Sequence, residues 1–164
     1  IVNIQNYLVF YFEPAPFFVI FATRNDMGGQ TINRMNKKKF IFERELRSRS
    51  GKIIWSLTGT PEGLAKWIAD GVERKGDVME LTWGCPERHH EKRRARITDE
   101  RAMSHLRWVW EDDAEGFVEI RMERCDVTDD YVLKVTDFAY DGDEEWLGSV
   151  WEANFERLRH AAGI

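Results

Sequence analysis

The sequence predicts an α+β fold in which a curved antiparallel sheet wraps around one long C-terminal helix. Three observations predict it: apolar residues at helical spacing near the end of the chain, short runs with alternating apolar and polar residues before them, and turn residues between those runs. Only one long helix is available to cover the apolar face of the sheet, so the sheet must bend around it. The expected order is a strand, two short helices, six further strands and the long helix.

Residues 144–160 carry the long helix. Its apolar residues follow the spacing that forms one stripe on a helix, and they are Leu147, Val150, Trp151, Phe155 and Leu158. Acidic residues at its N-terminal end suit the helix dipole, and Gly163 marks its end. Because most helical stability in proteins comes from packing an apolar face, this helix must lie against the preceding strands.

Alternation of period two begins at Lys38 and predicts the first strand. Phe40, Phe42 and Leu46 fall on its inner face. Arg44 falls on the same face, although a charge in that position needs a partner or water.

Two short helices are expected after this strand. Ser48 or Ser50 can cap the first helix through its hydroxyl group. In the second, Thr60 is the expected N-cap, Pro61 takes the first helical position, and the helix is expected to continue to Asp70.

Six runs with strand character follow, at residues 71–74, 78–83, 91–97, 104–110, 117–125 and 131–139. The first two are joined by Lys75-Gly76-Asp77, a tight hairpin connection in which Gly76 is expected to adopt a positive φ. The even spacing of the runs suits an antiparallel meander. Alternation places His105, Arg107, Glu119, Arg121, Glu123 and Lys134 on the outer face, in water.

The composition predicts a globular domain with a large core, because 43% of the residues are hydrophobic, with seven Trp and ten Phe. The formal net charge of −5 argues against a nucleic-acid or acidic-membrane partner. The basic run at residues 88–96 can form an anion-binding stripe, but a solvated, charged edge strand is the favoured interpretation. Cys85 and Cys125 are expected to be inert free thiols in a reducing, cytoplasmic environment.

Residues 1–35 differ in composition from the rest of the chain. Their aromatic-rich runs, 7–12 and 17–21, are interrupted by Pro14 and Pro16, which leaves no apolar stretch of the roughly 20 residues that a membrane span needs. We expect an extension outside the fold, with an additional packed strand or helix as the alternative. The folded domain is expected over residues 36–164.

Several local motifs accompany this order of elements: Lys38-Lys39-Phe40 in the first strand, Thr60-Pro61-Glu62-Gly63-Leu64-Ala65-Lys66-Trp67 at the second helix, Gly76-Asp77 in the first hairpin, Val135-Thr136-Asp137-Phe138-Ala139 in the last strand, and Trp151, Phe155 and Leu158 on the last helix. Together they resemble the helix-grip, START-like superfamily, also called SRPBCC. Within it they are similar to the branch of the activator of heat-shock-protein ATPase and its bacterial relatives. The resemblance implies a cavity that, across the superfamily, holds lipids, sterols, hormones or polyketides, with a minority of catalytic and of chaperone-binding members. No catalytic motif of the family can be carried over to this sequence.

The inward faces of the expected elements supply the candidates for a ligand cavity. They are Arg44, Met79, Leu81, Trp83, Trp108, Trp110, Met122, Leu133, Asp137, Trp151 and Phe155. The tryptophans can line a cavity for a flat or apolar ligand, with their indole N–H groups as donors, or they can simply fill the core. Arg44 and Asp137 can pair as a polar hook inside the cavity; alternatively, Arg44 lies at the rim and Asp137 accepts backbone hydrogen bonds in a turn.

Binding of a small apolar or amphipathic molecule between sheet and helix is the leading hypothesis for function, and it requires an enclosed cavity of roughly 300 Å³ or more. The second is a chaperone-associated module that meets a partner protein, which a filled interior and an exposed apolar patch would indicate. The third is a cavity enzyme, which needs a histidine or paired carboxylates beside the ligand, and the sequence shows no such pair. No cofactor is expected, and His89-His90-Glu91 predicts no metal site, because adjacent residues on a strand point to opposite faces.

Overall fold

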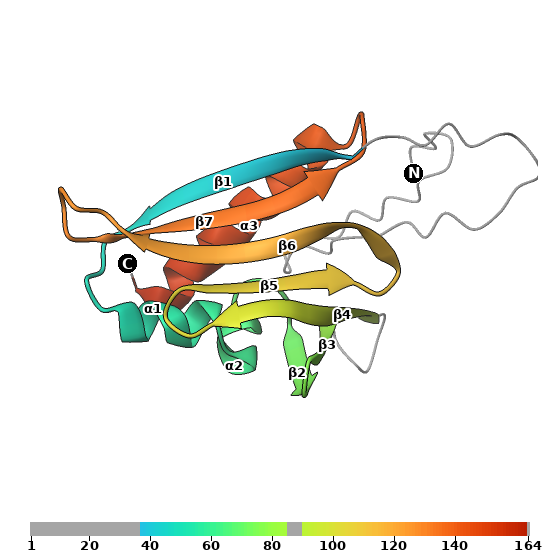
Figure 1. Ribbon diagram of the computed structural model, residues 1–164, viewed down its shortest axis with the longest axis horizontal. Coiled ribbons are helices and arrows are strands. Elements are labelled where there is room, and N and C mark those ends of the chain that lie inside the picture. The colour runs from blue at the N-terminus through green and yellow to red at the C-terminus, as the bar shows by residue number, and fades with distance from the viewer. Residues whose placement is uncertain (1–36, 85–89, 164) are drawn as a thin grey trace, which may run out of the picture.

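The computed structural model describes residues 37–84 and 90–163 (Figure 1). Its elements are β1 (Lys38–Leu46), α1 (Gly51–Thr58), α2 (Pro61–Leu64), β2 (Gly71–Lys75), β3 (Val78–Gly84), β4 (His90–Arg101), β5 (His105–Trp110), β6 (Asp113–Arg124), β7 (Tyr131–Ala139) and α3 (Glu144–Ala162). The strands form one antiparallel sheet in the order β1-β7-β6-β5-β4-β3-β2. The predicted order of elements and the helix-grip architecture are therefore confirmed.

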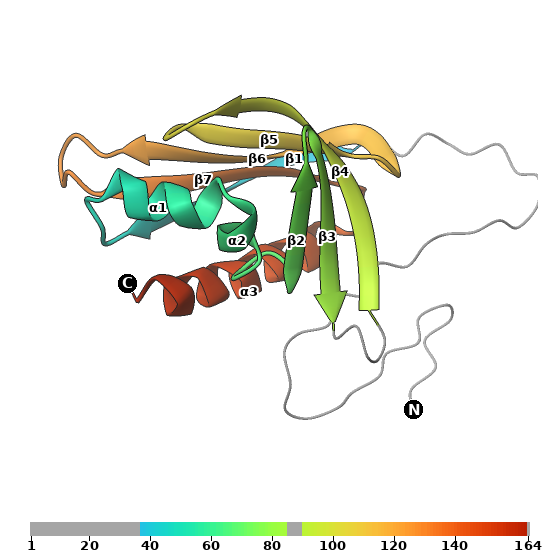
Figure 2. The same ribbon diagram turned by 90° about the horizontal axis from the view of Figure 1, so that it is seen from below.

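The sheet curves around α3. All three helices lie on its concave side, and β2, β3 and the first part of β4 turn away from the direction of the other strands (Figure 2). Register shifts between Ile97 and Asp99 in β4 and between Trp108 and Trp110 in β5 mark the bend. Irregularities of this kind increase strand twist, which allows one sheet to cover a single helix from two sides.

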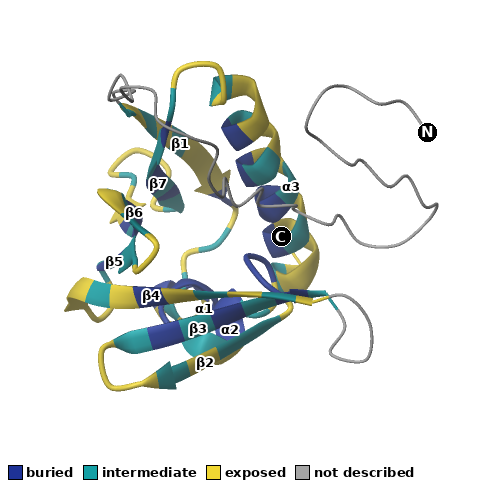
Figure 3. Ribbon diagram, turned by 90° about the vertical axis from the view of Figure 1, so that its right-hand side faces the viewer, coloured by how far each residue is buried: buried dark blue, intermediate teal, exposed yellow. Residues whose placement is uncertain are grey.

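The apolar stripe of α3 faces the sheet, as the spacing predicts (Figure 3). Leu147, Trp151, Phe155 and Leu158 are buried, and the helix ends at Gly163 with φ 67°, the left-handed conformation that glycine adopts without strain.

The short helices start at their predicted caps. The Ser50 side chain accepts a hydrogen bond from the backbone N–H of Ile53, and Thr60 accepts one from Gly63 at 3.1 Å. The regular part of α2 ends at Leu64, earlier than the predicted Asp70, and turns continue the chain from there. A Cβ at Gly63 would lie 2.1 Å from the backbone oxygen of Ser56, so the close approach of α1 and α2 requires glycine at this position.

Strand β4 lies between β3 and β5, so the expectation of a charged edge strand is wrong. Its outward residues Arg94 and Arg96 are close to carboxylates of neighbouring strands and turns. Arg93 instead faces inward, with its guanidinium 4.3 Å from the centre of the Trp110 ring. The edges of the sheet are β1 and β2.

The outer face also differs from expectation, because His105 and Glu119 are buried rather than in water. Glu119 lies between Arg107 and Arg121, and a ring nitrogen of His105 is 3.0 Å from Asp99. Alternation gives the face of a residue, but long neighbouring side chains decide its exposure.

Several predictions concern residues outside the described part of the chain. They include the extension at residues 1–35 and the roles of Cys85, Arg88 and His89. Among the described helices, none combines the length and apolar character that crossing a membrane requires.

Candidate functional site

Aromatic side chains fill much of the space between the sheet and α3. The ring of Trp67 lies 6.2 Å from those of Trp151 and Phe155, and the ring of Phe42 lies 6.3 Å from that of Trp151. Further candidates from the sequence are buried in the same core, and they are Met79, Leu81, Trp83, Trp108, Met122 and Leu133. Trp110 is partly buried and packs against this core. These residues are brought together as predicted, but as packed core.

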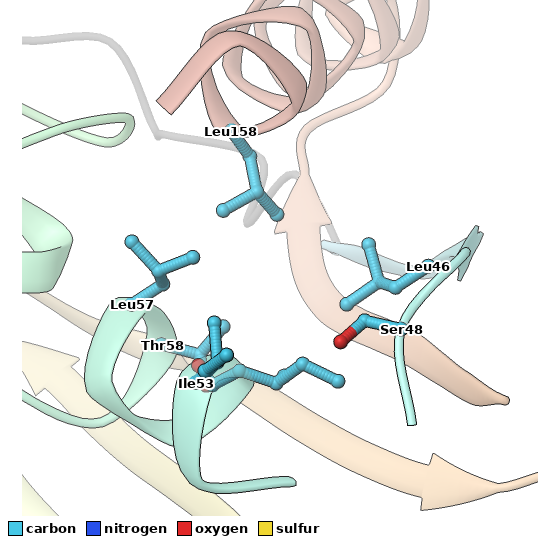
Figure 4. Close-up of a pocket in the computed structure, with 7 residues that line it drawn as sticks. Leu46, Ser48, Ile53, Leu57, Thr58 and Leu158 are labelled. Atoms are coloured by element: carbon cyan, nitrogen blue, oxygen red, sulfur yellow. The ribbon is translucent and has the colours of Figure 1, made fainter. Parts of the chain in front are cut away.

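A small hollow remains at one end of this core, between α1, the end of β1 and α3 (Figure 4). Its volume is about 10 Å³, which is room for about one water molecule. Leu46 and Leu158 form two of its walls, and Ile54 and Leu57 of α1 contribute others. The described residues thus enclose no hollow here of the size that a ligand needs.

The tryptophans of the core differ in how their indole N–H groups are satisfied. Trp67 donates to the backbone oxygen of Leu57 at 2.9 Å, and Trp83 donates to that of Ile68 at 2.7 Å. The indole nitrogen of Trp108, a residue only 1% exposed, has no hydrogen-bond partner in the part of the chain that the structure describes. A buried donor without a partner costs free energy, so Trp108 is a weak point in an otherwise satisfied core.

Asp137 connects the last strand to α3. One carboxylate oxygen accepts a hydrogen bond from the backbone N–H of Phe138 at 2.7 Å, and the other accepts one from the indole N–H of Trp151 at 2.9 Å. Burial raises the pKa of Asp137 to about 6, although both hydrogen bonds and the charges of Lys37 and Arg93 oppose this rise. The Asp137 carboxylate therefore has a structural role, because it links β7 to α3 at the helix–sheet interface.

Arg44 does not pair with Asp137, and the predicted polar hook is wrong. Arg44 pairs instead with Glu152 of α3, and its guanidinium lies 5.1 Å from the centre of the Phe155 ring. In the β1–β7 register Arg44 is opposite Leu133, whereas Asp137 is opposite Phe40. Four residues of strand separate the two positions, or roughly 13 Å, which no ion pair spans. The alternative, with Arg44 at the rim, holds.

A larger hollow lies open at this rim, between the end of β1 and the C-terminal half of α3. Its volume is about 320 Å³, and it is lined by Arg44, Glu45, Leu46, Arg47, Phe155, Glu156, Leu158 and Arg159. We call it the rim groove. Leu46 and Leu158 line both this groove and the small hollow beside α1, so the groove lies at the end of the core.

The charges of the rim groove are unevenly paired. Arg159 donates two hydrogen bonds to Glu156, and the pKa of Glu156 is lowered chiefly by Arg159, with a smaller contribution from the charge of Arg44. Arg44 is paired with Glu152. Within the described residues neither Arg47 nor Glu45 has an ion pair, so the groove combines an apolar floor with one unpaired guanidinium and one unpaired carboxylate at its edge.

Comparison with known proteins places this geometry in a family. The family model of the START-like superfamily domain matches residues 34–164. The chain belongs to the START-like superfamily. A search of curated proteins finds no match.

Solved structures similar to this START-like chain include a protein from Bacteroides fragilis studied by NMR in solution. It is 35% identical, over 79% of this chain and 94% of that chain, with a TM-score of 0.54. The Aha1 dimer from Colwellia psychrerythraea is 14% identical, over 77% of this chain and 97% of that chain, with a TM-score of 0.60. An AHSA1-like protein from Aeromonas hydrophila is 16% identical, over 77% of this chain and 94% of that chain, with a TM-score of 0.56. The family that the sequence motifs suggested is thereby confirmed, and the proteins named Aha1 and AHSA1-like share the fold.

Sequence reasoning on this START-like chain missed half of the rim groove. Glu156 and Arg159 were assigned to the water-facing side of the last helix, and Arg47 lies beyond the alternating part of the first strand. No local pattern marks them, because they meet Arg44 only where α3 passes the end of β1. Among the described residues, no group of His, Cys, Asp and Glu is arranged to hold a metal ion.

Proposed function

We propose that this START-like protein binds a small amphipathic molecule in the rim groove. The observation that carries the proposal is the volume of the groove, about 320 Å³, which lies at the lower end of the range of small-molecule pockets, about 300–1,000 Å³. The ligand thus lies at the edge of the helix–sheet interface, because aromatic side chains occupy the space farther inside.

The lining of the groove favours a ligand with an apolar body and an anionic head. Leu46, Phe155 and Leu158 offer the apolar contact. The guanidinium of Arg47 is exposed, and its planar fork suits a carboxylate or a phosphate. The carbonyl end of α3 disfavours an anion near the last helical turn, so we expect the head group beside β1 rather than beside Gly163.

A titration followed by NMR tests the proposal. Decanoate, added to the ¹⁵N-labelled full chain, is expected to shift the amide signals of Leu46, Arg47, Phe155 and Leu158, whereas decyltrimethylammonium, with the same tail and a positive head, is expected to bind several-fold more weakly. Arg47→Gln should weaken decanoate binding about tenfold, in line with the loss of one charge-assisted hydrogen bond.

Arg49→Gln is the matched control. Arg49 is two residues farther along, is largely exposed and lies 3.8 Å from Asp130, outside the groove. The Arg49→Gln variant removes the same charge, but from a position outside the groove. The affinity of this variant for decanoate should therefore stay within about twofold of the parent. Amide shifts centred on Trp108 would refute the rim groove as the site, and so would equal losses of decanoate affinity in Arg47→Gln and Arg49→Gln.

A second candidate function is a chaperone-associated protein-interaction module, which the filled interior favours. Its fold is shared with solved proteins named Aha1 and AHSA1-like. Native mass spectrometry of the protein purified from its own cells separates the two candidates. A co-purifying small molecule supports the first, and a co-purifying chaperone without such a molecule supports the second. A cytoplasmic location remains part of both proposals, and the free thiol of Cys125 agrees with it.

A further inference from the structure

The convex face of the sheet carries a charged cluster at its centre. One row across four strands consists of Arg107, Glu119, Thr136 and Ile41. The next row consists of His105, Arg121, Lys134 and Glu43. This side of the sheet faces away from the helices (Figure 2).

Glu119 holds two arginines in fixed positions. Arg107 donates from Nε and Nη2 to one carboxylate oxygen at 2.8 and 2.6 Å, and Arg121 donates from Nε to the other at 3.1 Å. Glu119 is only 6% exposed, although it lies on the face turned away from the core. We call Arg107 and Arg121 the arginine pair.

Burying a carboxylate costs free energy, and the positive charges of Arg107 and Arg121 offset this cost for Glu119. Its burial by itself would raise the pKa, but the two guanidinium groups outweigh this and hold the pKa of Glu119 below its usual value. Glu119 alone leaves one of the two guanidinium charges unbalanced, and Asp99, opposite Arg107 in the β4–β5 register, offsets part of it. The side chains of the arginine pair are thereby ordered before any partner arrives, which lowers the entropy cost of binding.

The arginine pair keeps donors available. Nη1 of Arg107 and both Nη atoms of Arg121 make no hydrogen bond to another described residue, and each side chain is about one-third exposed. The guanidinium of Arg107 lies 4.5 Å from the centre of the Phe117 ring.

Apolar side chains lie on the same face as the pair, and one of them, Phe117, is in contact with Arg107. The ring centres of Phe117 and Phe138 are 5.0 Å apart, and Ile41, in the same row as Arg107, is 55% exposed. Arginine and aromatic residues are enriched at the centres of protein interfaces.

From this arrangement we propose that the convex face binds a partner protein that presents an acidic segment, with its carboxylates on the arginine pair. The pair lies on a convex sheet face, whereas small ligands are bound in concave sites. Asp99, Glu43 and Glu123 flank it, which disfavours an extended anionic membrane or nucleic acid but leaves room for a short segment.

The test uses an acetylated, amidated hexaglutamate peptide and the ¹⁵N-labelled full chain. The peptide is expected to shift the Nε–H signals of Arg107 and Arg121 and the amide signal of Phe117, with an affinity that falls as salt is added. Arg121→Gln should lower the affinity about tenfold, while Arg107 still compensates Glu119. Arg121→Lys, which keeps the charge without the planar fork, should also weaken binding and guards against a folding defect in the first variant.

Arg94→Gln is the matched control, because Arg94 is an exposed outward arginine of β4 with carboxylates 4.0 and 3.9 Å away. It should bind the peptide within about twofold of the parent, since exposed charges at a distance are screened. The proposal is overturned if the peptide shifts signals centred on Arg47 or Arg94. It is also overturned if inorganic phosphate or phosphatidylglycerol vesicles shift the signals of the arginine pair as strongly as the peptide does. If the same signals move when the protein alone is concentrated, the face belongs to self-association and the proposal is likewise overturned.

Discussion

Trp151 donates its indole N–H to Asp137 across the interface between α3 and β7, at 2.9 Å. This bond joins the terminal helix to the strand that precedes it, at a position where the carboxylate is largely withdrawn from water. The bond has a consequence for stability as a function of pH.

Replacement of Asp137 by Asn is expected to remove a pH dependence from the stability of the protein. The pKa of Asp137 is raised from 3.8 to about 6, so the native state binds the proton more tightly than the unfolded state. The contribution of this group to stability is therefore greatest below about pH 4 and is lost as the pH rises through 6. Asp137→Asn has no titrating group at this position, and its amide nitrogen cannot accept the second hydrogen bond, so the variant should be less stable than the parent at pH 4 and the deficit should shrink by about 1–3 kcal/mol by pH 7.5. Urea denaturation from pH 4 to 7.5 measures this difference, and parallel curves would contradict it.

Trp108→Phe is expected to cost less stability than Trp67→Phe. Both side chains are buried, but the indole N–H of Trp67 donates to Leu57, whereas that of Trp108 has no partner among the described residues. Loss of the first bond leaves a buried carbonyl unsatisfied, so the two variants should differ by about 1–3 kcal/mol in the free energy of unfolding. Thermal and urea unfolding of both variants provide the comparison. Equal losses in the free energy of unfolding of the two variants would mean that ring volume alone decides the effect.

Gly63→Ala is expected to disrupt the contact between the short helices. Its Cβ would approach the Ser56 carbonyl oxygen to 2.1 Å, and backbone atoms would have to move. We expect a loss of about 2 kcal/mol or more in the free energy of unfolding. Gly148→Ala in α3 is the control, because a Cβ there meets nothing within 4 Å. Its effect should be a gain of about 0.5–1 kcal/mol from helix propensity, and a similar loss in both variants would exclude the steric explanation.

Arg44→Gln is expected to cost little. Arg44 and its partner Glu152 are both exposed, with 43% and 60% of their side chains accessible, and such pairs contribute about 0–1 kcal/mol. A double-mutant cycle with Glu152→Gln, measured by urea unfolding, should give a coupling energy of less than about 1 kcal/mol. A loss of about 3–5 kcal/mol in the free energy of unfolding of Arg44→Gln would instead indicate that Arg44 takes part in a buried ion pair, which the sequence alone suggested.

The order of elements and the faces that form the core could be predicted from local sequence patterns. Helical spacing identified Leu147, Trp151, Phe155 and Leu158, and period-two alternation identified Met79, Leu81, Leu133 and most other inward residues. These features depend on the backbone geometry of one element at a time, so a local pattern records them. The caps at Ser50 and Thr60 were predictable for the same reason.

Contacts between residues of different elements depend on how those elements pack in three dimensions. Arg44 and Glu152 are 108 positions apart, and the register of β1 on β7 keeps Arg44 away from Asp137. The groove beside Arg47, the unpaired indole of Trp108 and the burial of Glu119 between two arginines depend on distances between elements. Periodicity assigns a side chain to a face, but it contains no information about the side chain that lies opposite in space.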